Sequence, residues 1–234
     1  MPSPFRKALQ QLKSTLLPPG EAPYRVRLGL FKGLVLNLDL HHQAQVAFGL
    51  WERETYRTVH SLLAGCHSAI DVGACAGEFT LLFLRSPGLQ NVIAIEPYPP
   101  NLPRLDANLR LNDLDQDPRL SLHTQRLGSD TTDGKTIRLD DLTIPTTGPV
   151  FIKIDVDGGE LDVLQSGPTL LQRPDIRLLV ETHSVQLERD CLEFLTNAGY
   201  HCQIIPNAWW RRFLPEDRPM GQNRWLIATP NTIR

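Results

Sequence analysis

The sequence predicts an α/β fold built on a mostly parallel, seven-stranded sheet, and three observations support this prediction. From Ser68 onward, short apolar strands alternate with amphipathic helices, a pattern typical of a parallel sheet with helices on both faces. A glycine-containing loop joins the first of these strands to a helix. Finally, only a loop connects the last two strands, 201–205 and 223–229, which indicates that the final strand is antiparallel.

Period-two patterns and continuous apolar runs place the individual strands. The seven predicted strands cover residues 68–73, 91–96, 120–126, 150–155, 176–181, 201–205 and 223–229. Predicted helices cover about 77–85 and 100–111, a stretch after Asp155 that ends near Gly167, and about 185–198. The polar segment 135–142 is expected to be an excursion from the alternating pattern.

The first 49 residues are predicted to form an appendage, which leaves 50–234 as the main domain. A short helix over Phe5–Leu17 is expected, because its apolar residues recur on one face and Pro18 follows it. Apolar residues then alternate over 24–30 and 34–40, which predicts a β-hairpin. A further helix is expected over about 50–64.

Length and composition narrow the class of protein. A chain of 234 residues is long enough for one sizeable α/β domain. The net charge of −2 gives no indication of nucleic-acid binding. Residues 1–34 nevertheless carry six basic side chains against one acidic side chain, which indicates a solvated basic face or a surface for an acidic partner or a membrane. The four cysteines form no C-x-x-C pair, and no apolar run is long enough to span a bilayer, so we expect a cytoplasmic protein with reduced thiols.

The loop after the first main-domain strand carries the strongest functional signal. It reads D-x-G-x-x-x-G, with Asp71, Gly73 and Gly77 at the named positions. A dinucleotide-binding loop needs a central glycine where a pyrophosphate approaches the backbone, and this loop lacks one. The spacing therefore favours a smaller ligand without phosphate, such as S-adenosylmethionine (SAM), over NAD.

Other polar residues lie at the carboxyl ends of the predicted strands, where open α/β sheets bind their ligands. Glu96 follows the second strand, 23 residues after Gly73, where a carboxylate can accept hydrogen bonds from ribose hydroxyls. Gly128 follows the third strand, and Asp155 follows the fourth. We interpret Asp155 as functional, and the nearby Asp157 as the N-cap of the next helix.

Glu181 and His183 lie two residues apart at the end of the fifth strand, so their side chains can point to the same side. His183 is a candidate general base oriented by Glu181, although a structural role for this histidine is an equal alternative. Together with Asp155, these residues offer metal ligands, but no spacing demands a metal and none is predicted. The segment Trp209–Phe213 suggests either a substrate lid or ordinary packing.

At this point the chain resembles the FkbM-type SAM-dependent methyltransferases. The matching blocks, in order, are DVGACAGEFT at 71–80, VIAIEPYPPN at 92–101, LRLN at 109–112, IRLDDL at 137–142, IKIDVDGGELDVLQSG at 152–167 and LLVETH at 178–183. The resemblance covers about residues 50–200. It implies a class I, Rossmann-like methyltransferase fold and methyl transfer from SAM, usually to a hydroxyl oxygen of a sugar or polyketide-type product.

The resemblance also implies roles for particular residues. Gly73 and Gly77 would line the methionine part of SAM, Glu96 would hold the ribose, and Asp155 would face the reactive centre. The remaining residues of the predicted cofactor site are Asp71, Ala74, Cys75, Pro97 and Gly128. The chain departs from the family pattern at three places, with Cys75 in place of Asn, Asp157 in place of Glu and Gly159 in place of Ala.

These observations predict a SAM-dependent O-methyltransferase whose acceptor is a small molecule, such as a carbohydrate or a polyketide-like product. The alternative is a non-catalytic SAM-binding or scaffold protein, for which Cys75 is the only hint in the sequence. A third possibility, an NAD-linked enzyme, is disfavoured by the glycine spacing. The N-terminal hairpin is a possible contact in a homodimer.

Overall fold

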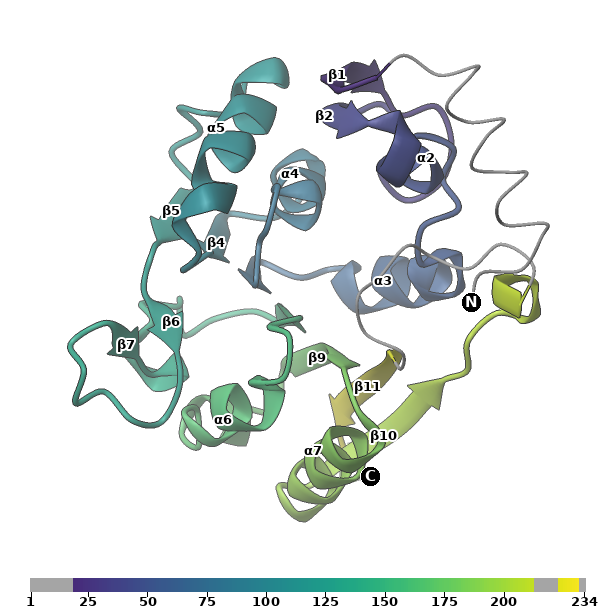
Figure 1. Cartoon of the computed structure of the whole chain (residues 1–234). Coiled ribbons are helices and arrows are strands. Elements are labelled where there is room, and N and C mark those ends of the chain that lie inside the picture. The colour runs from purple at the N-terminus through teal and green to yellow at the C-terminus, as the bar shows by residue number, and fades with distance from the viewer. Residues whose placement is uncertain (1–18, 213–222, 232–234) are drawn as a thin grey trace.

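The computed structural model describes residues 19–212 and 223–231, and it contains the predicted seven-stranded sheet (Figure 1). The strand order is β10-β11-β9-β8-β3-β4-β5. The bounds are β3 Ser68–Val72, β4 Asn91–Ile95, β5 Leu120–His123, β8 Val150–Ile154, β9 Ile176–Thr182, β10 Tyr200–Ile205 and β11 Arg224–Pro230. Strand β11 runs antiparallel to both of its neighbours, and the other neighbouring pairs are parallel, which confirms the prediction of an antiparallel final strand.

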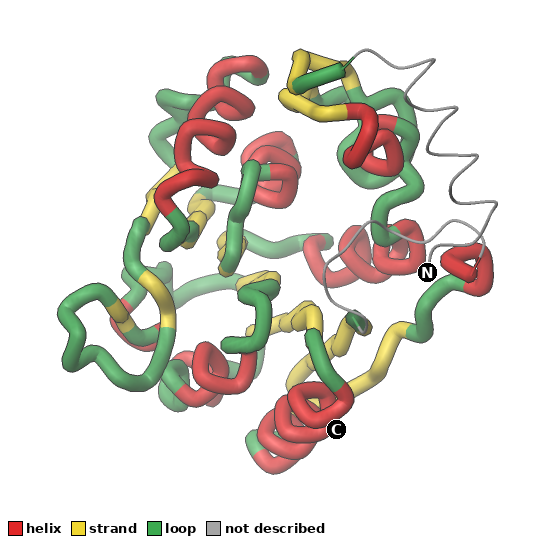
Figure 2. The backbone as a smooth tube through the Cα atoms, viewed as in Figure 1, coloured by secondary structure: helices red, strands yellow, loops and turns green. Residues whose placement is uncertain are grey.

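Two groups of helices cover the two faces of this sheet, as Figure 2 shows. Successive strand residues alternate between the two cores, so that Ala69 lies in one and Ile70 in the other. The first core holds residues of α3 (Tyr56–Leu63), α4 (Glu78–Arg85) and α5 (Leu102–Leu111). The second core holds residues of α6 (Glu160–Gln165) and α7 (Val185–Asn197). Both faces are therefore buried, as expected for a parallel sheet.

Short elements complete the described part of the chain. They are the 3-10 helices η1 Arg53–Thr55, η2 Pro99–Asn101, η3 Leu139–Asp141, η4 Leu170–Gln172 and η5 Trp209–Arg212, and the paired strands β6 Arg126–Leu127 and β7 Thr136–Ile137. The segment expected to be an excursion thus contributes β7 and η3 and lies outside the main sheet.

The N-terminal region differs in detail from the expectation. Strands β1 (Glu21–Arg25) and β2 (Val35–Asp39) pair antiparallel but are shorter than the predicted hairpin strands. Leu40 continues the period-two pattern in the sequence, yet it begins helix α2 (Leu40–Ala47), because the Asp39 side chain accepts a hydrogen bond from the His41 N–H and caps the helix. The helix predicted over 50–64 is divided into η1 and α3. The predicted helix over Phe5–Leu17 lies outside the described residues.

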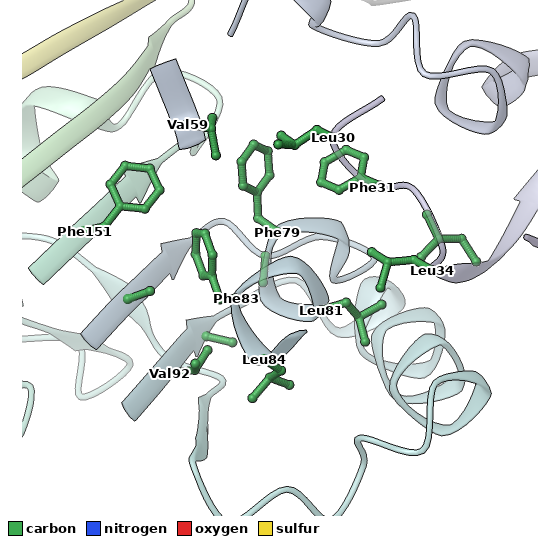
Figure 3. Close-up of a cluster of buried hydrophobic side chains, with 14 of the residues drawn as sticks. Leu30, Phe31, Leu34, Val59, Phe79, Leu81, Phe83, Leu84, Val92 and Phe151 are labelled. Atoms are coloured by element: carbon green, nitrogen blue, oxygen red, sulfur yellow. The ribbon is translucent and has the colours of Figure 1, made fainter. Parts of the chain in front are cut away.

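The N-terminal region shares its core with the sheet. Figure 3 shows the aromatic side chains that connect them: Phe31 contacts Phe79 of α4, Phe79 contacts Phe83, and Phe83 contacts Phe151 of β8. The ring centroids are 5.3, 5.9 and 5.6 Å apart, within the range of favourable aromatic pairs. The residues predicted as an appendage therefore pack directly onto the helix that follows the glycine loop.

Candidate functional site

A cavity of about 610 Å³ opens at the carboxyl ends of the central strands. Its lining includes the residues that follow β3, β4, β8 and β9, where ligands bind in open parallel sheets. The cavity brings together most of the predicted site residues: Gly73, Ala74, Cys75, Glu96, Pro97, Asp155, Glu181 and His183.

The loop between β3 and α4 forms one wall of the cavity, and its backbone geometry requires glycine. Gly73 has a φ of 78°, and a Cβ atom at this position would lie 1.8 Å from the Asp155 carbonyl oxygen. The N–H groups of Gly73 and Ala74 both donate to the Ile95 carbonyl, which ties the loop to the end of β4. Gly77 precedes α4 with a φ of 89°. The first glycine is thus required by the close approach of two strand ends.

Glu96 lies beside this loop and is only 4 % exposed. One of its carboxylate oxygens accepts a hydrogen bond from the Cys75 N–H at 2.6 Å, and the other accepts from the Tyr98 N–H at 2.8 Å. Each carboxylate oxygen can accept two hydrogen bonds, so one further acceptor position per oxygen remains for a ligand. The side chain is therefore fixed in place and suited to receive hydroxyl donors.

Lys153 is a buried cation beneath the site that the sequence analysis did not identify. Its Nζ lies 3.2 Å from Asp71 Oδ1 and 3.5 Å from Asp155 Oδ2, and it donates to the Gly73 carbonyl at 2.7 Å. Burial alone would lower the pKa of this ammonium group, but the carboxylates of Asp71 and Asp155 raise it above its ordinary value. Lys153 therefore links two strand ends to the glycine loop. The only sequence signal was a lysine within an apolar strand.

Asp155 and His183 face one another across the cavity floor, and Glu160 holds the imidazole ring. Nδ1 of His183 lies 2.7 Å from Glu160 Oε1, and Nε2 lies 3.5 Å from Asp155 Oδ1. Glu181, which we expected to orient the ring, lies 4.0 Å from Nε2 and accepts from Asn223 at 2.6 Å instead. Glu160 is the first residue of α6 and does not lie at a strand end, so its contact with His183 emerges only from the fold.

The electrostatic surroundings of His183 favour its protonated form. Burial of the ring opposes protonation, but the hydrogen bond with Glu160 and the charge of Asp155 raise the pKa of the imidazole above its ordinary value. The charges of Glu160 and Asp157 act in the same direction.

The predicted N-cap role of Asp157 is wrong. Helix α6 has Gly159 at its N-cap position, without a side-chain hydrogen bond. The side chain of Asp157 is 85 % exposed, and its Oδ1 lies 3.5 Å from Nε2 of His183. With a φ of 53°, Asp157 adopts a left-handed conformation, so the chain turns before the helix begins and the carboxylate is directed toward the cavity instead.

Three predicted cofactor residues do not line the cavity. Asp71 is fully buried and accepts a hydrogen bond from Thr80 Oγ1 at 2.7 Å. Gly77 lies against α5, where an added Cβ would be 3.4 Å from Leu105. Gly128 lies against Asp162, with a Cβ position only 2.4 Å from the carboxylate. These residues support the cavity walls from behind.

The N-terminal region forms a further part of the cavity wall, which sequence reasoning missed. The residues concerned are Phe31, Gln43, Val46, Trp51 and Glu52. No strand-end or spacing pattern marks them, because their position depends on how the region folds over α4. Of the predicted lid segment, the described Trp209 is 73 % exposed, and Arg211 forms an ion pair with Glu54 at 2.6 Å.

Two general properties of the chain bear on the sequence expectations. No helix within residues 19–212 and 223–231 is long and apolar enough to cross a membrane. All four cysteines are free thiols: Cys66 and Cys191 are buried, Cys202 is half-buried, and Cys75 is exposed.

The sheet order, the glycine loop and the strand-end carboxylates define the class I SAM-dependent methyltransferase fold, and solved structures of that class share it. A SAM-dependent O-methyltransferase from Thermotoga maritima aligns with a TM-score of 0.50 and 12% identity, covering 76% of this chain and 65% of that chain. TYW2 of M. jannaschii, in complex with AdoMet, aligns with a TM-score of 0.50 and 14% identity, covering 90% and 86%.

The resemblance to FkbM-type methyltransferases is confirmed. Residues 110–202 match the model of the Methyltransferase FkbM domain. Methyltransferase FkbM from Methylobacillus flagellatus KT aligns with a TM-score of 0.56 and 22% identity over 70% of this chain. That alignment covers 43% of the M. flagellatus protein, so this chain spans less than half of its length. No curated protein matches the chain. The match to the FkbM domain model and the shared fold support SAM as the cofactor.

Proposed function

We propose that this protein transfers the methyl group of SAM to a hydroxyl oxygen of a small molecule. The observation that carries the proposal is the pairing of Glu96 with the loop at Gly73–Cys75 on one side of a cavity that also contains Asp155 and His183. A ribose-binding carboxylate, a tight glycine loop and a group able to accept a proton are thus within one enclosed space.

SAM fits the residues present. Glu96 would accept hydrogen bonds from the ribose hydroxyls through the acceptor positions left on its two oxygens. The loop at Gly73–Cys75 would contact the methionine part, and Pro97 and Tyr98 would flank the adenine. The AdoMet complex of the M. jannaschii protein, which has this fold, supports the same choice of cofactor.

When bound, SAM supplies a methyl group already activated by its positively charged sulfur. Catalysis by the protein is then mainly a matter of positioning the acceptor oxygen in line with the carbon–sulfur bond. The acceptor oxygen would take the methyl group, S-adenosylhomocysteine would leave, and the hydroxyl proton would pass to a nearby base. Asp155 and His183 are the candidates, because both line the cavity and lie within 3.5 Å of one another.

The acceptor would occupy the part of the cavity beside the N-terminal wall. Phe31, Val46 and Trp51 supply apolar surface there, while Gln43 and Glu52 supply polar groups. Such a mixture suits a hydroxylated molecule with apolar faces, such as a sugar or a polyketide-like product. The carbohydrate or natural-product acceptor expected from the family resemblance is compatible with this wall.

We also propose a reducing, cytoplasmic setting, because all four cysteines are free thiols.

His183 provides the test of this function. We expect His183→Ala to slow methyl transfer by roughly 100-fold or more, because proton removal by a positioned base contributes about that much. Affinity for SAM should be unchanged, since His183 lies away from the glycine loop and Glu96. Single-turnover assays with a panel of sugars and hydroxylated metabolites, together with calorimetry, measure the two effects separately. Equal turnover by both proteins would leave His183 with a structural role only. SAM binding without transfer to any acceptor would favour the alternative of a SAM-binding scaffold.

A further inference from the structure

Three potential metal ligands converge at the floor of the cavity. One ligand atom from each of Asp155, Glu181 and His183 lies within 4.8 Å of the other two. Nε2 of His183 is 3.5 Å from Asp155 Oδ1 and 4.0 Å from Glu181 Oε2. Asp155 and His183 face the cavity, so a bound ion would have coordination positions open toward a ligand there.

Each of these three residues is held by a second group on the atom that points away from the cluster. Lys153 lies 3.5 Å from the other oxygen of Asp155. Asn223 donates to the other oxygen of Glu181, and Glu160 Oε1 lies 2.7 Å from Nδ1 of His183. This is the arrangement by which proteins orient metal ligands, including the carboxylate–histidine pair that directs Nε2 toward a metal.

The two separations measured from Nε2 of His183 suit a single ion. Two ligand atoms bound to one metal at about 2.1 Å are at most about 4.2 Å apart. The distances from Nε2 of His183 to Asp155 and to Glu181 already meet this limit. Both distances are longer than a good hydrogen bond, so Nε2 of His183 makes no close hydrogen bond to either of these two carboxylates.

The local charge also favours a cation. Five carboxylates, those of Asp71, Asp155, Asp157, Glu160 and Glu181, surround one lysine and one histidine. Three of them, Asp71, Glu160 and Glu181, are almost completely buried. A divalent ion bound here would add positive charge to that of Lys153 beside these carboxylates.

We propose that Asp155, Glu181 and His183 bind a divalent transition-metal ion, such as Mn²⁺, beside the proposed acceptor position. A set of one imidazole and two carboxylates suits an ion of intermediate softness better than Ca²⁺, which prefers oxygen ligands alone. With the ion bound, Nε2 of His183 would be a ligand and could not accept the proton. The ion would instead attract the acceptor oxygen and favour release of its proton to solvent, and this part of the inference rests on the proposed function. The spacing in the sequence did not require such a site, because only the fold brings Glu160 and Asn223 behind the ligands.

A proton on Nε2 of His183 is the competing explanation for the cluster. An imidazolium ion between Asp155 and Glu181 would also offset their charge. The two explanations differ in what they predict when metal is added, since a protonated ring does not bind a metal ion.

The test uses the full-length protein, free of affinity tags and treated with a chelator. Free Mn²⁺ is measured by electron paramagnetic resonance during titration, with and without S-adenosylhomocysteine. We expect one Mn²⁺ per chain. Glu181→Gln and His183→Gln should each weaken binding at least tenfold, and Glu160→Leu, which removes the group behind His183, about 10- to 100-fold. Glu160→Gln keeps an acceptor for Nδ1 and should restore most of the affinity.

Asp175→Asn is the matched control, because it removes one negative charge at the amino end of β9, away from the carboxyl end that carries the cluster, and Asp175 pairs there with Arg173. It should leave Mn²⁺ binding unchanged, and circular dichroism verifies that each variant folds. Absence of saturable Mn²⁺ binding up to about 1 mM would overturn the proposal. Equal affinity of Glu181→Gln, His183→Gln and the unchanged protein would also overturn it. Calorimetry with S-adenosylhomocysteine tests the proposed function separately, so the two claims can fail independently.

Discussion

At the scale of single residues, Cys75 contributes its backbone and its side chain to the candidate site in different ways. Its backbone N–H binds Glu96, while its exposed thiol lines the cavity. Desolvation within the cavity, together with the carboxylates of Glu78 and Glu96, raises the pKa of this thiol to about 11. The residue differs from the Asn of the family pattern, yet the contact with Glu96 uses only its backbone. Substitution of the side chain therefore leaves the glycine loop and Glu96 connected.

The raised pKa of Cys75 predicts slow alkylation. Only the thiolate reacts, so at pH 8 the rate should be roughly 100-fold lower than for a thiol with a pKa of 9.0. The rate should rise about tenfold per pH unit and level off only near pH 11. Iodoacetamide labelling followed by peptide mass spectrometry measures this and distinguishes Cys75 from Cys202. Rapid labelling at pH 7 would contradict the described surroundings of the thiol, and Cys75→Ser identifies its contribution.

Sequence reasoning correctly located the residues whose position depends on where a strand ends. Gly73, Glu96, Asp155 and His183 follow predicted strands, and all of them line the cavity. It failed for Glu160, because this residue acts through a helix that packs beside β9, and no local pattern reveals that contact. Spacing in the sequence indicates which residues lie at the carboxyl ends of the strands. Only the packed structure shows which other side chains contact those residues and fix their positions.

At the scale of elements, α5 connects the N-terminal strands to the glycine loop. Asn108, fully buried on this helix, accepts a hydrogen bond from the Asn37 N–H of β2 at 2.7 Å. It also donates to the Ala76 carbonyl at 2.7 Å, within the loop that leads into α4. The amide side chain of Asn108 therefore connects the loop that leads into α4 with strand β2 of the N-terminal region.

Asn108→Ala should therefore lower both stability and cofactor affinity. It leaves a backbone N–H and a carbonyl without their partners, at a cost of about 1–3 kcal/mol each. Asn112→Ala is the matched control: Asn112 binds both Val35 backbone groups but does not contact the loop. Urea unfolding should show both variants destabilised, whereas calorimetry should show weakened S-adenosylhomocysteine binding only for Asn108→Ala. The same affinity in all three proteins would show that α5 does not position the loop.

Element boundaries were predictable where one strong pattern prevailed. The main-sheet strands show either apolar runs or period-two alternation, and all seven occur close to their predicted positions. Helix α2 was missed because Leu40 extends an alternating pattern by one residue, while the cap at Asp39 decides the structure. Local side-chain hydrogen bonds can override periodicity at such a boundary.

At the scale of the whole molecule, the N-terminal region and the sheet share one hydrophobic core. The contacts from Phe31 through Phe79 and Phe83 to Phe151 run from the N-terminal region to the centre of the sheet. We therefore propose that the parts of the chain before and after the predicted division at residue 49 differ in role, the first forming part of the acceptor wall and the second binding the cofactor. On this proposal, the two parts do not fold as separate units. The homodimer stays a prediction of the sequence.

A shared core predicts cooperative unfolding. Urea transitions followed by tryptophan fluorescence and by far-ultraviolet circular dichroism should coincide, because loss of the N-terminal region would expose Phe79 and its neighbours. Two separate transitions would mean that the region before residue 50 unfolds independently.

The central claim is that the glycine loop and Glu96 bind SAM, and calorimetry with SAM and S-adenosylhomocysteine tests it most directly. The account predicts saturable binding of both ligands at roughly micromolar affinity. Glu96→Ala should weaken that binding about 10- to 100-fold or more, because it removes charge-assisted hydrogen bonds worth about 1.5–3 kcal/mol each. Absence of binding by the folded protein, or the same affinity in the variant, would contradict the assignment of the cofactor site.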